Sequence, residues 1–185
     1  MTTDYERPAR VGDWMQTYTG RQFWPVDPRP DDVHIDDIAH ALSMVCRYGG
    51  HVLDFYSVAE HCCHLHDEAA PEHKAWALLH DASEAYIADI IRPLKPSLKG
   101  YLDHERVVMW AICIRFGLKQ EMPPEVKTLD NRILADEAAQ AMSAPPAPWA
   151  YNGEPLGIKL GFWPPYMAKR EFLARFKALN LGVRI

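Results

Sequence analysis

Cysteine is scarce in this sequence and occurs in no metal-binding or redox motif. The 185 residues include four cysteines and no CxxC spacing, which excludes a cysteine-based zinc module and gives no sign of a disulfide framework. Cys46, Cys62, Cys63 and Cys113 each lie among apolar residues of predicted helices. We therefore expect reduced thiols in the core of a cytoplasmic protein.

Long apolar runs, basic runs and alternating strand patterns are also missing. No apolar run approaches the roughly 20 residues of a membrane-spanning helix, so no membrane partner is expected. The 20 Lys and Arg are outnumbered by 25 Asp and Glu, for a formal net charge of −5. This balance makes a nucleic acid an unfavourable partner. With few strand signals and 48% hydrophobic residues, an all-α globular fold is predicted.

The helix signals that are present divide the chain into an arm, a core and a tail. Residues 1–33 are predicted to form a short irregular or hairpin arm, and residues 143–185 a loop and a final helix. The core covers about 34–142, and the whole of 1–185 is predicted to be one domain. The predicted helices are bounded by capping, proline and glycine signals: Asp36 to Gly49-Gly50, Ser57 to Ala69, Pro71 to before Arg92-Pro93, 101–116, one opened by Pro123-Pro124, and one from Pro165.

Four ionisable side chains are predicted to lie on helix faces that are otherwise apolar: His61, His80, Asp81 and Asp130. Taken singly, each would more commonly be a hydrogen-bonded core residue. A buried unpaired carboxylate is costly, however, and one shared cation would satisfy all four side chains together. Two imidazoles and two carboxylates suit a single divalent transition metal, Zn²⁺, Mn²⁺, Co²⁺ or Fe²⁺. Glu84 follows on the same predicted helix and would stand beside this ion rather than bind it.

The order His … His-Asp … Asp resembles that of the HD-domain metal-dependent phosphohydrolases. The resemblance extends over about 36–137 and is closer to the bacterial and phage-encoded HD 5′-nucleotidase-like proteins, which implies an HD-domain helical bundle. Four sequence elements carry it, in the order of that group: Ser57-Val58-Ala59-Glu60-His61, then His80-Asp81-Ala82-Ser83-Glu84, then Asp89 with Arg92-Pro93-Leu94-Lys95, and finally Val126-Lys127-Thr128-Leu129-Asp130.

The resemblance implies a role for each of these residues. His61, His80, Asp81 and Asp130 would hold the metal ion. Glu84, with Asp81, would act in catalysis by orienting or activating the attacking water. The substrate would be bound by Arg47 at the phosphate, Tyr48 and Asp89 at the sugar, and Lys95 in the Pro-Lys segment. Structural alternatives remain for four of them. Arg47 could be a helix C-terminal charge, and Asp89 could cap a turn before Pro93. Glu84 taken alone could be a surface helix residue, and Lys95 could be a loop lysine.

The implied activity is metal-dependent hydrolysis of the phosphate of (deoxy)nucleoside 5′-monophosphates. A triphosphohydrolase acting on dNTPs is one alternative, and a metal-stabilised nucleotide-binding or regulatory module without turnover is another. Phosphodiesterases and di-iron oxygenases of the superfamily need further histidine ligands, whereas only His104 lies between Asp81 and Asp130. The expected partners are a small-molecule nucleotide and, in a possible homodimer, a second copy of the chain.

Overall fold

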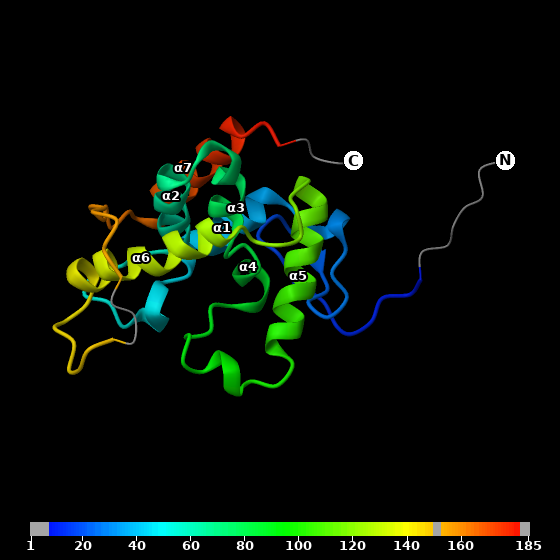
Figure 1. Cartoon of the computed structure of the whole chain (residues 1–185). Helices are drawn as coiled ribbons and strands as arrows, with labels where there is room; N and C mark the ends of the chain where they lie inside the picture. Colours follow the sequence, from blue (N-terminus) through cyan, green and yellow to red (C-terminus); the bar gives the residue numbers. More distant parts are fainter. Residues whose placement is uncertain (1–7, 150–152, 182–185) are drawn as a thin grey trace.

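The computed structural model describes residues 8–149 and 153–181, and this part of the chain is mostly helical (Figure 1). The predicted mostly helical class is therefore confirmed. Within these two ranges, no helix has both the length and the apolar character required to cross a membrane. The α-helices are α1 (Ile35–Met44), α2 (Val58–Glu68), α3 (Lys74–Leu79), α4 (Glu84–Ile87), α5 (Tyr101–Phe116), α6 (Pro124–Ala141) and α7 (Pro165–Ala178).

The N-terminal arm contains a small antiparallel hairpin, which is one of the two forms predicted for it. Its strands are β1 (Met15–Gln16) and β2 (Gln22–Phe23), with Met15 opposite Phe23. The Phe23 side chain is buried and its ring stacks on Tyr86 at a centroid distance of 3.8 Å. The hairpin is thus attached to the core beside α4.

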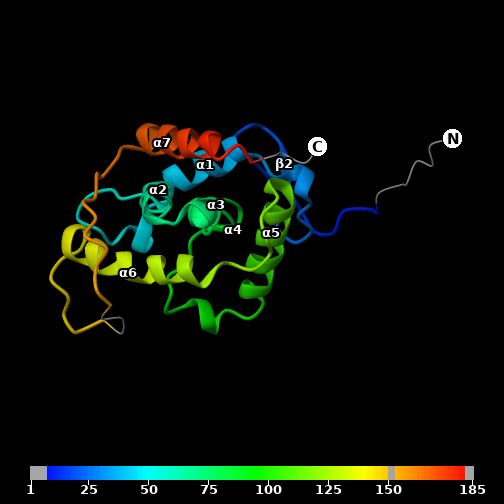
Figure 2. The ribbon, with the colours of Figure 1, turned by 45° about the horizontal axis from the view of Figure 1, so that its top comes forward.

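Helix α2 is central to the bundle. It contacts α1, α3, α6 and α7, and Figure 2 shows α2 and α3 between the α1–α7 pair on one side and α6 on the other. Its buried Val58, Ala59, Cys62, Cys63 and Leu65 contribute to the core. Because α2 and α6 are in contact, residues that face each other across them can form a site inside the bundle.

The first core helix ends earlier than predicted. Helix α1 stops at Met44, and Val45 and Cys46 are extended. The β-branched Val45 accepts a hydrogen bond from the backbone N–H of Val58 at 3.0 Å, and Cys46 forms an isolated antiparallel bridge with Ser57. Because this backbone pairing takes the place of a further helical turn, Arg47 does not lie at the C-terminus of α1. The alternative that Arg47 interacts with the dipole of that helix is therefore wrong. Arg47 instead begins the short 3-10 helix η2 (Arg47–Gly50).

The single helix predicted from Pro71 onward is broken in two places. A 3-10 turn η3 (Pro71–His73) precedes α3, and residues 80–83 form a turn between α3 and α4. In that turn the backbone N–H groups of Ala82 and Glu84 donate to the carbonyls three residues earlier, at 3.0 Å in both cases. The break changes the directions of the side chains on either side of it, which include His80, Asp81 and Glu84.

The remaining helices agree closely with prediction. Helix α5 covers the predicted 101–116 and ends at Gly117, whose φ of 69° suits glycine. Leu102, in its first turn, is 51% exposed. Helices α6 and α7 begin within the predicted proline signals. A short 3-10 helix η4 (Lys95–Ser97) lies in the predicted 92–100 loop, and η1 (Pro30–Asp32) precedes α1.

Two buried carboxylates attach residues 153–163, which we call the C-terminal strap, to the bundle. Glu60 of α2 accepts hydrogen bonds from the backbone N–H groups of Gly161, Phe162 and Trp163 at 2.6–2.9 Å. Asp136 of α6 accepts three more, from residues 156–158 at 2.7–3.0 Å. The strap therefore links the two helices that carry the predicted ligands His61 and Asp130.

Candidate metal centre

The four predicted ligands meet inside the bundle. His61 comes from α2, His80 and Asp81 from the turn after α3, and Asp130 from α6. The Nε2 atom of His61 lies 3.2 Å from His80 Nε2, 3.5 Å from Asp130 Oδ1 and 3.7 Å from Asp81 Oδ2. His80 Nε2 lies 3.2 Å from Asp81 Oδ2 and 3.9 Å from Asp130 Oδ1.

These separations fit a shared ion. Ligand bonds of about 2.0–2.2 Å place the donor atoms around one tetrahedral ion roughly 3 to 3.5 Å apart. The buried His61, His80 and Asp130 form a group that could hold a metal ion. Asp81 adds a carboxylate oxygen at comparable distance from both imidazoles.

Both imidazoles are oriented by a partner on their outer nitrogen. His61 Nδ1 lies 2.7 Å from Glu137 Oε1, and His80 Nδ1 lies 2.8 Å from the Ala77 carbonyl. Since both partners are acceptors, we assign the proton to Nδ1 in each ring, which leaves the two Nε2 lone pairs facing one another. Two lone pairs at 3.2 Å repel unless a proton or a cation lies between them.

The carboxylates are ionised and make the cluster attractive to a cation. Although burial favours their neutral forms, the neighbouring imidazoles hold the pKa values of Asp81 and Asp130 well below their usual range. Burial likewise opposes charge on His80, yet the Asp81 carboxylate raises the pKa of that imidazole. The same negative potential would favour a metal ion.

Asp130 uses its two oxygens differently. Its Oδ2 atom accepts from Lys127 at 2.7 Å and from Arg92 at 3.3 Å. Its Oδ1 atom faces His61 and His80. The cations at the outer oxygen hold the carboxylate in place while the inner oxygen remains directed at the cluster.

Cys62 offers a second possible ligand set with His80 and Asp81. Its sulfur lies 3.9 Å from His80 Nδ1, the nitrogen that bonds the Ala77 carbonyl. Burial raises the pKa of the Cys62 thiol, and a neutral thiol is a poor metal ligand. The geometry therefore favours the set that includes His61 and Asp130.

Glu84 is buried beside the cluster at the start of α4. Its Oε1 lies 3.5 Å from Lys95 Nζ, whereas its Oε2 is buried and has no hydrogen-bond partner within 8–149 and 153–181. Burial first, and then the negative charges of Asp81 and Asp89, raise the pKa of Glu84 to about 9. A buried carboxyl oxygen without a partner is costly unless a water or ligand occupies the neighbouring space.

The predicted substrate-binding residues surround this carboxyl group and the cluster. Arg47 is buried, with one guanidinium nitrogen 3.7 Å from Asp81 Oδ2. The carboxylate of Asp89 lies near that of Glu84, and burial raises the pKa of Asp89. Lys95 contacts Glu84 and, at 2.9 Å, Glu105.

Tyr48 lies next to Arg47 in an uncommon backbone conformation. Its φ of 56° is left-handed, like that of Gly49 after it. Its ring is 5.9 Å from that of Trp149, measured between centroids. The side chains of Arg47 and Tyr48 both contact Glu137.

Glu137 belongs to this network but was not predicted from the sequence. It is fully buried on α6 and contacts His61, Arg47 and Tyr48. Its spacing of seven residues from Asp130 places both carboxylates on one face of the helix. That spacing was the available signal, since a second acidic residue in the buried stripe of α6 also needs a partner.

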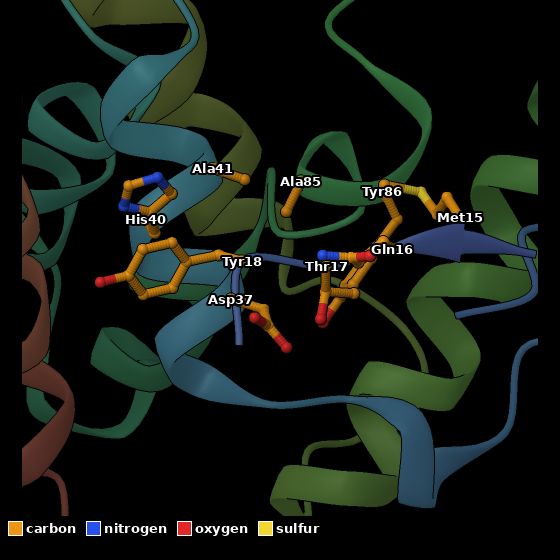
Figure 3. Close-up of a pocket in the computed structure, with 9 residues that line it drawn as sticks. All are labelled: Met15, Gln16, Thr17, Tyr18, Asp37, His40, Ala41, Ala85 and Tyr86. Carbon is orange, nitrogen blue, oxygen red and sulfur yellow. The ribbon is translucent and has the colours of Figure 1, made fainter. Parts of the chain in front are cut away.

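A pocket of about 290 Å³ lies apart from this cluster, between the N-terminal arm, α1 and α4. Figure 3 shows Tyr18 of the arm lying against His40 of α1, and their rings stack at 3.7 Å. The pocket is lined by Met15, Gln16, Thr17, Tyr18, Asp37, His40, Ala41, Ala85 and Tyr86. None of the predicted site residues belongs to this lining.

The chain is similar to two curated proteins, and no family model matches it. It is 40% identical to the uncharacterized protein YfdR of Escherichia coli K12 over 125 residues, which cover 67% of this chain and 70% of YfdR. It is 32% identical to the uncharacterized protein RCAP_rcc00048 of Rhodobacter capsulatus over 186 aligned positions, 90% of this chain and 95% of that protein. The chain therefore belongs to the family of YfdR and RCAP_rcc00048.

Proposed function

We propose that this protein is an HD-domain phosphohydrolase that removes the phosphate of (deoxy)nucleoside 5′-monophosphates. The observation that carries the proposal is that oxygens of Asp81 and Asp130 lie within 3.2–3.9 Å of the facing Nε2 atoms of His61 and His80. A histidine from one helix, a His-Asp pair after another and an aspartate from a third match the order that defines HD domains. The buried, unpartnered oxygen of Glu84 beside them supports hydrolysis rather than a structural ion site.

The four ligands would hold one Zn²⁺, Mn²⁺, Co²⁺ or Fe²⁺. A divalent ion there supplies Lewis acidity toward a phosphoryl oxygen and toward water. Glu137 and the Ala77 carbonyl keep the two histidine rings in the tautomer that presents Nε2. The ligand set is therefore preorganised by its own hydrogen bonds.

Glu84 is placed to handle the proton of the attacking water. Its free Oε2 can accept a hydrogen bond, while its Oε1 is held by Lys95. A general base contributes typically about 10²–10⁴-fold to a hydrolytic rate. The raised pKa of Glu84 would be offset by a nearby cation, so the ionised form is the active one when an ion is bound.

Arg47 would hold the phosphate. Its planar guanidinium suits two phosphate oxygens, and its buried Nε atom has no hydrogen-bond partner in the described part of the chain. Asp89 can accept a hydrogen bond from a sugar hydroxyl. The tilted rings of Tyr48 and Trp149 offer an aromatic surface beside Arg47 for the nucleoside.

A nucleotide screen tests the proposal. Purified protein with Mn²⁺, Co²⁺ or Zn²⁺ is expected to release inorganic phosphate from nucleoside 5′-monophosphates. The Glu84→Gln variant should lose about 10²–10⁴-fold in kcat while its Mn²⁺ affinity remains within about threefold of wild type. Glu105→Gln is the matched control, because Glu105 also contacts Lys95 but lies outside the cluster.

Two results would contradict it. Release of neither phosphate nor tripolyphosphate from any nucleotide would leave a binding or regulatory module. Equal turnover by Glu84→Gln and wild type would remove Glu84 from the mechanism.

A dNTP triphosphohydrolase is the second candidate. Arg92 and Lys127 are 57% and 50% exposed at their side chains and lie at the outer oxygen of Asp130. Their spare donors place positive charge where a longer polyphosphate could bind. Tripolyphosphate as the product, instead of inorganic phosphate, would favour this activity.

A further inference from the structure

Glu137 lies between the metal-ligand set and the residues proposed to bind phosphate. Its side chain is fully buried on α6. One oxygen, Oε1, is 2.7 Å from His61 Nδ1. The other, Oε2, accepts from Arg47 at 3.0 Å and from the Tyr48 hydroxyl. A single carboxylate thus contacts α2 through one oxygen and η2 through the other.

Only a carboxylate can satisfy all of these partners. His61 Nδ1–H, the Arg47 guanidinium and the Tyr48 hydroxyl all donate, so both oxygens of Glu137 must accept. A glutamine at this position would have one accepting oxygen and one amide group that donates. The amide would face either His61 or the Arg47–Tyr48 pair with donor against donor, leaving buried groups unpaired.

We propose that Glu137 is a positioning residue shared by the two halves of the site: it orients His61 toward the metal ion and Arg47 and Tyr48 toward the anion. The identity of that anion as a substrate phosphate rests on the proposed function. Outer partners of metal-ligating histidines typically contribute about 10–100-fold to metal affinity. Here the same partner also fixes the guanidinium that faces Asp81.

The test measures two affinities without turnover, for Mn²⁺ alone and for inorganic phosphate at saturating Mn²⁺. In Glu137→Gln we expect the Mn²⁺ affinity to fall about 10–100-fold. The phosphate affinity should fall at least about fivefold, because one charged hydrogen bond to Arg47 is lost. Glu137→Asp keeps the charge but shortens the side chain, and it should also weaken both affinities. This variant provides the test if Glu137→Gln does not fold.

Asp136→Asn is the matched control. Asp136 precedes Glu137 on α6 and is also buried, but it binds backbone N–H groups of the strap. This variant should lower thermal stability and leave both affinities within about twofold of wild type. If the Glu137 variants acted through a general loss of packing, Asp136→Asn would lower the affinities for Mn²⁺ and phosphate as well.

The inference is overturned if either Glu137 variant, shown to be folded, keeps wild-type affinity for Mn²⁺ or for phosphate. It is also overturned if wild type binds no Mn²⁺, or if Asp136→Asn loses both affinities equally. A protein that binds both ions through Glu137 but hydrolyses no nucleotide would retain this inference and contradict the proposed hydrolysis. The two proposals therefore fail separately.

Discussion

At the scale of single residues, the site gathers two imidazoles and two carboxylates around one position. The Nε2 atoms of the two histidines lie 3.2 Å apart, and one oxygen of each carboxylate lies 3.2–3.9 Å from them. Arg47 approaches Asp81, and Arg92 and Lys127 reach only the outer oxygen of Asp130. A divalent ion would complete the balance at the centre.

The substitution Asp130→Asn tests this balance. The amide keeps the size of the side chain but removes a negative charge and an anionic ligand, so Mn²⁺ affinity should fall by more than the roughly 100-fold upper range of outer partners. Titration with Mn²⁺ against a competing chelator measures it. As control, Asn131→Asp changes the neighbouring residue, which contacts Arg92, and should leave the affinity within about threefold; equal loss in both variants would contradict the assignment.

The grouping of His61, His80, Asp81 and Asp130 could be anticipated from sequence, because each is an ionisable residue among apolar helical neighbours. The same reasoning applies to Glu137, seven residues after Asp130. The environment of Arg47 could not be derived, since it depends on a left-handed Tyr48, and no local signal predicts positive φ at a tyrosine.

At the scale of elements, the break between α3 and α4 is the main difference between prediction and structure. Of residues 80–83 only Ala82 is a strong helix former, so local propensity gives a continuous helix little support there. The structure makes a turn there, which allows His80 and Asp81 to face His61 while Glu84 begins a new helix. The predicted continuity rested on the apolar pattern of Trp76 and Leu79, and the weak propensity of His80, Asp81 and Ser83 is consistent with the turn.

A second connection between elements joins α2 to α7 through Asp67 and Arg175. The guanidinium donates to both carboxylate oxygens, at 2.6 and 2.9 Å. Burial alone would raise the pKa of Asp67, but the hydrogen bonds from Arg175 and His66 hold that pKa below its usual range. The Asp67 side chain is 48% exposed, so solvent screening limits the contribution to about 1 kcal/mol.

This pair predicts a pH-dependent stability. A depressed folded-state pKa means that the stabilisation is complete above the unfolded pKa of about 4 and is lost as the pH falls through the folded value. Asp67→Asn should therefore lower the free energy of unfolding by about 1 kcal/mol at pH 7, with a smaller difference below about pH 4. Urea unfolding at several pH values measures this.

Glu171→Gln is the control, because Glu171 pairs with Arg175 only within α7. It should have little effect on the free energy of unfolding. A difference between wild type and Asp67→Asn that stays constant down to pH 3 would show that the ion pair is not the cause.

At the scale of the whole molecule, the cluster joins α2, the turn after α3 and α6, and the strap joins α2 and α6 again. An ion that binds only the folded chain stabilises it by mass action, by about 2.7 kcal/mol when its free concentration is 100 times the Kd. Removal of metal by a chelator should lower the Tm by about 5–10 °C for a chain of this size. Differential scanning calorimetry before and after reloading measures the shift, and an unchanged Tm in a protein shown to have lost its metal would contradict it.

The helical class and most helix positions could be predicted from sequence because glycine and proline mark the ends of α5, α6 and α7. The connections could not, because Cys46 pairs with Ser57, eleven residues away in sequence, and Val45 with Val58, thirteen residues away. The cytoplasmic location and the possible homodimer remain predictions.

The central claim is that His61, His80, Asp81 and Asp130 share one ion. Anomalous diffraction from a crystal of Zn²⁺-loaded protein tests it most directly. We expect one peak per chain, about 2.0–2.2 Å from Nε2 of both histidines and from a carboxylate oxygen of each aspartate. A map with no peak among these four side chains would contradict the account. Protons and hydrogen bonds alone would then balance their charges.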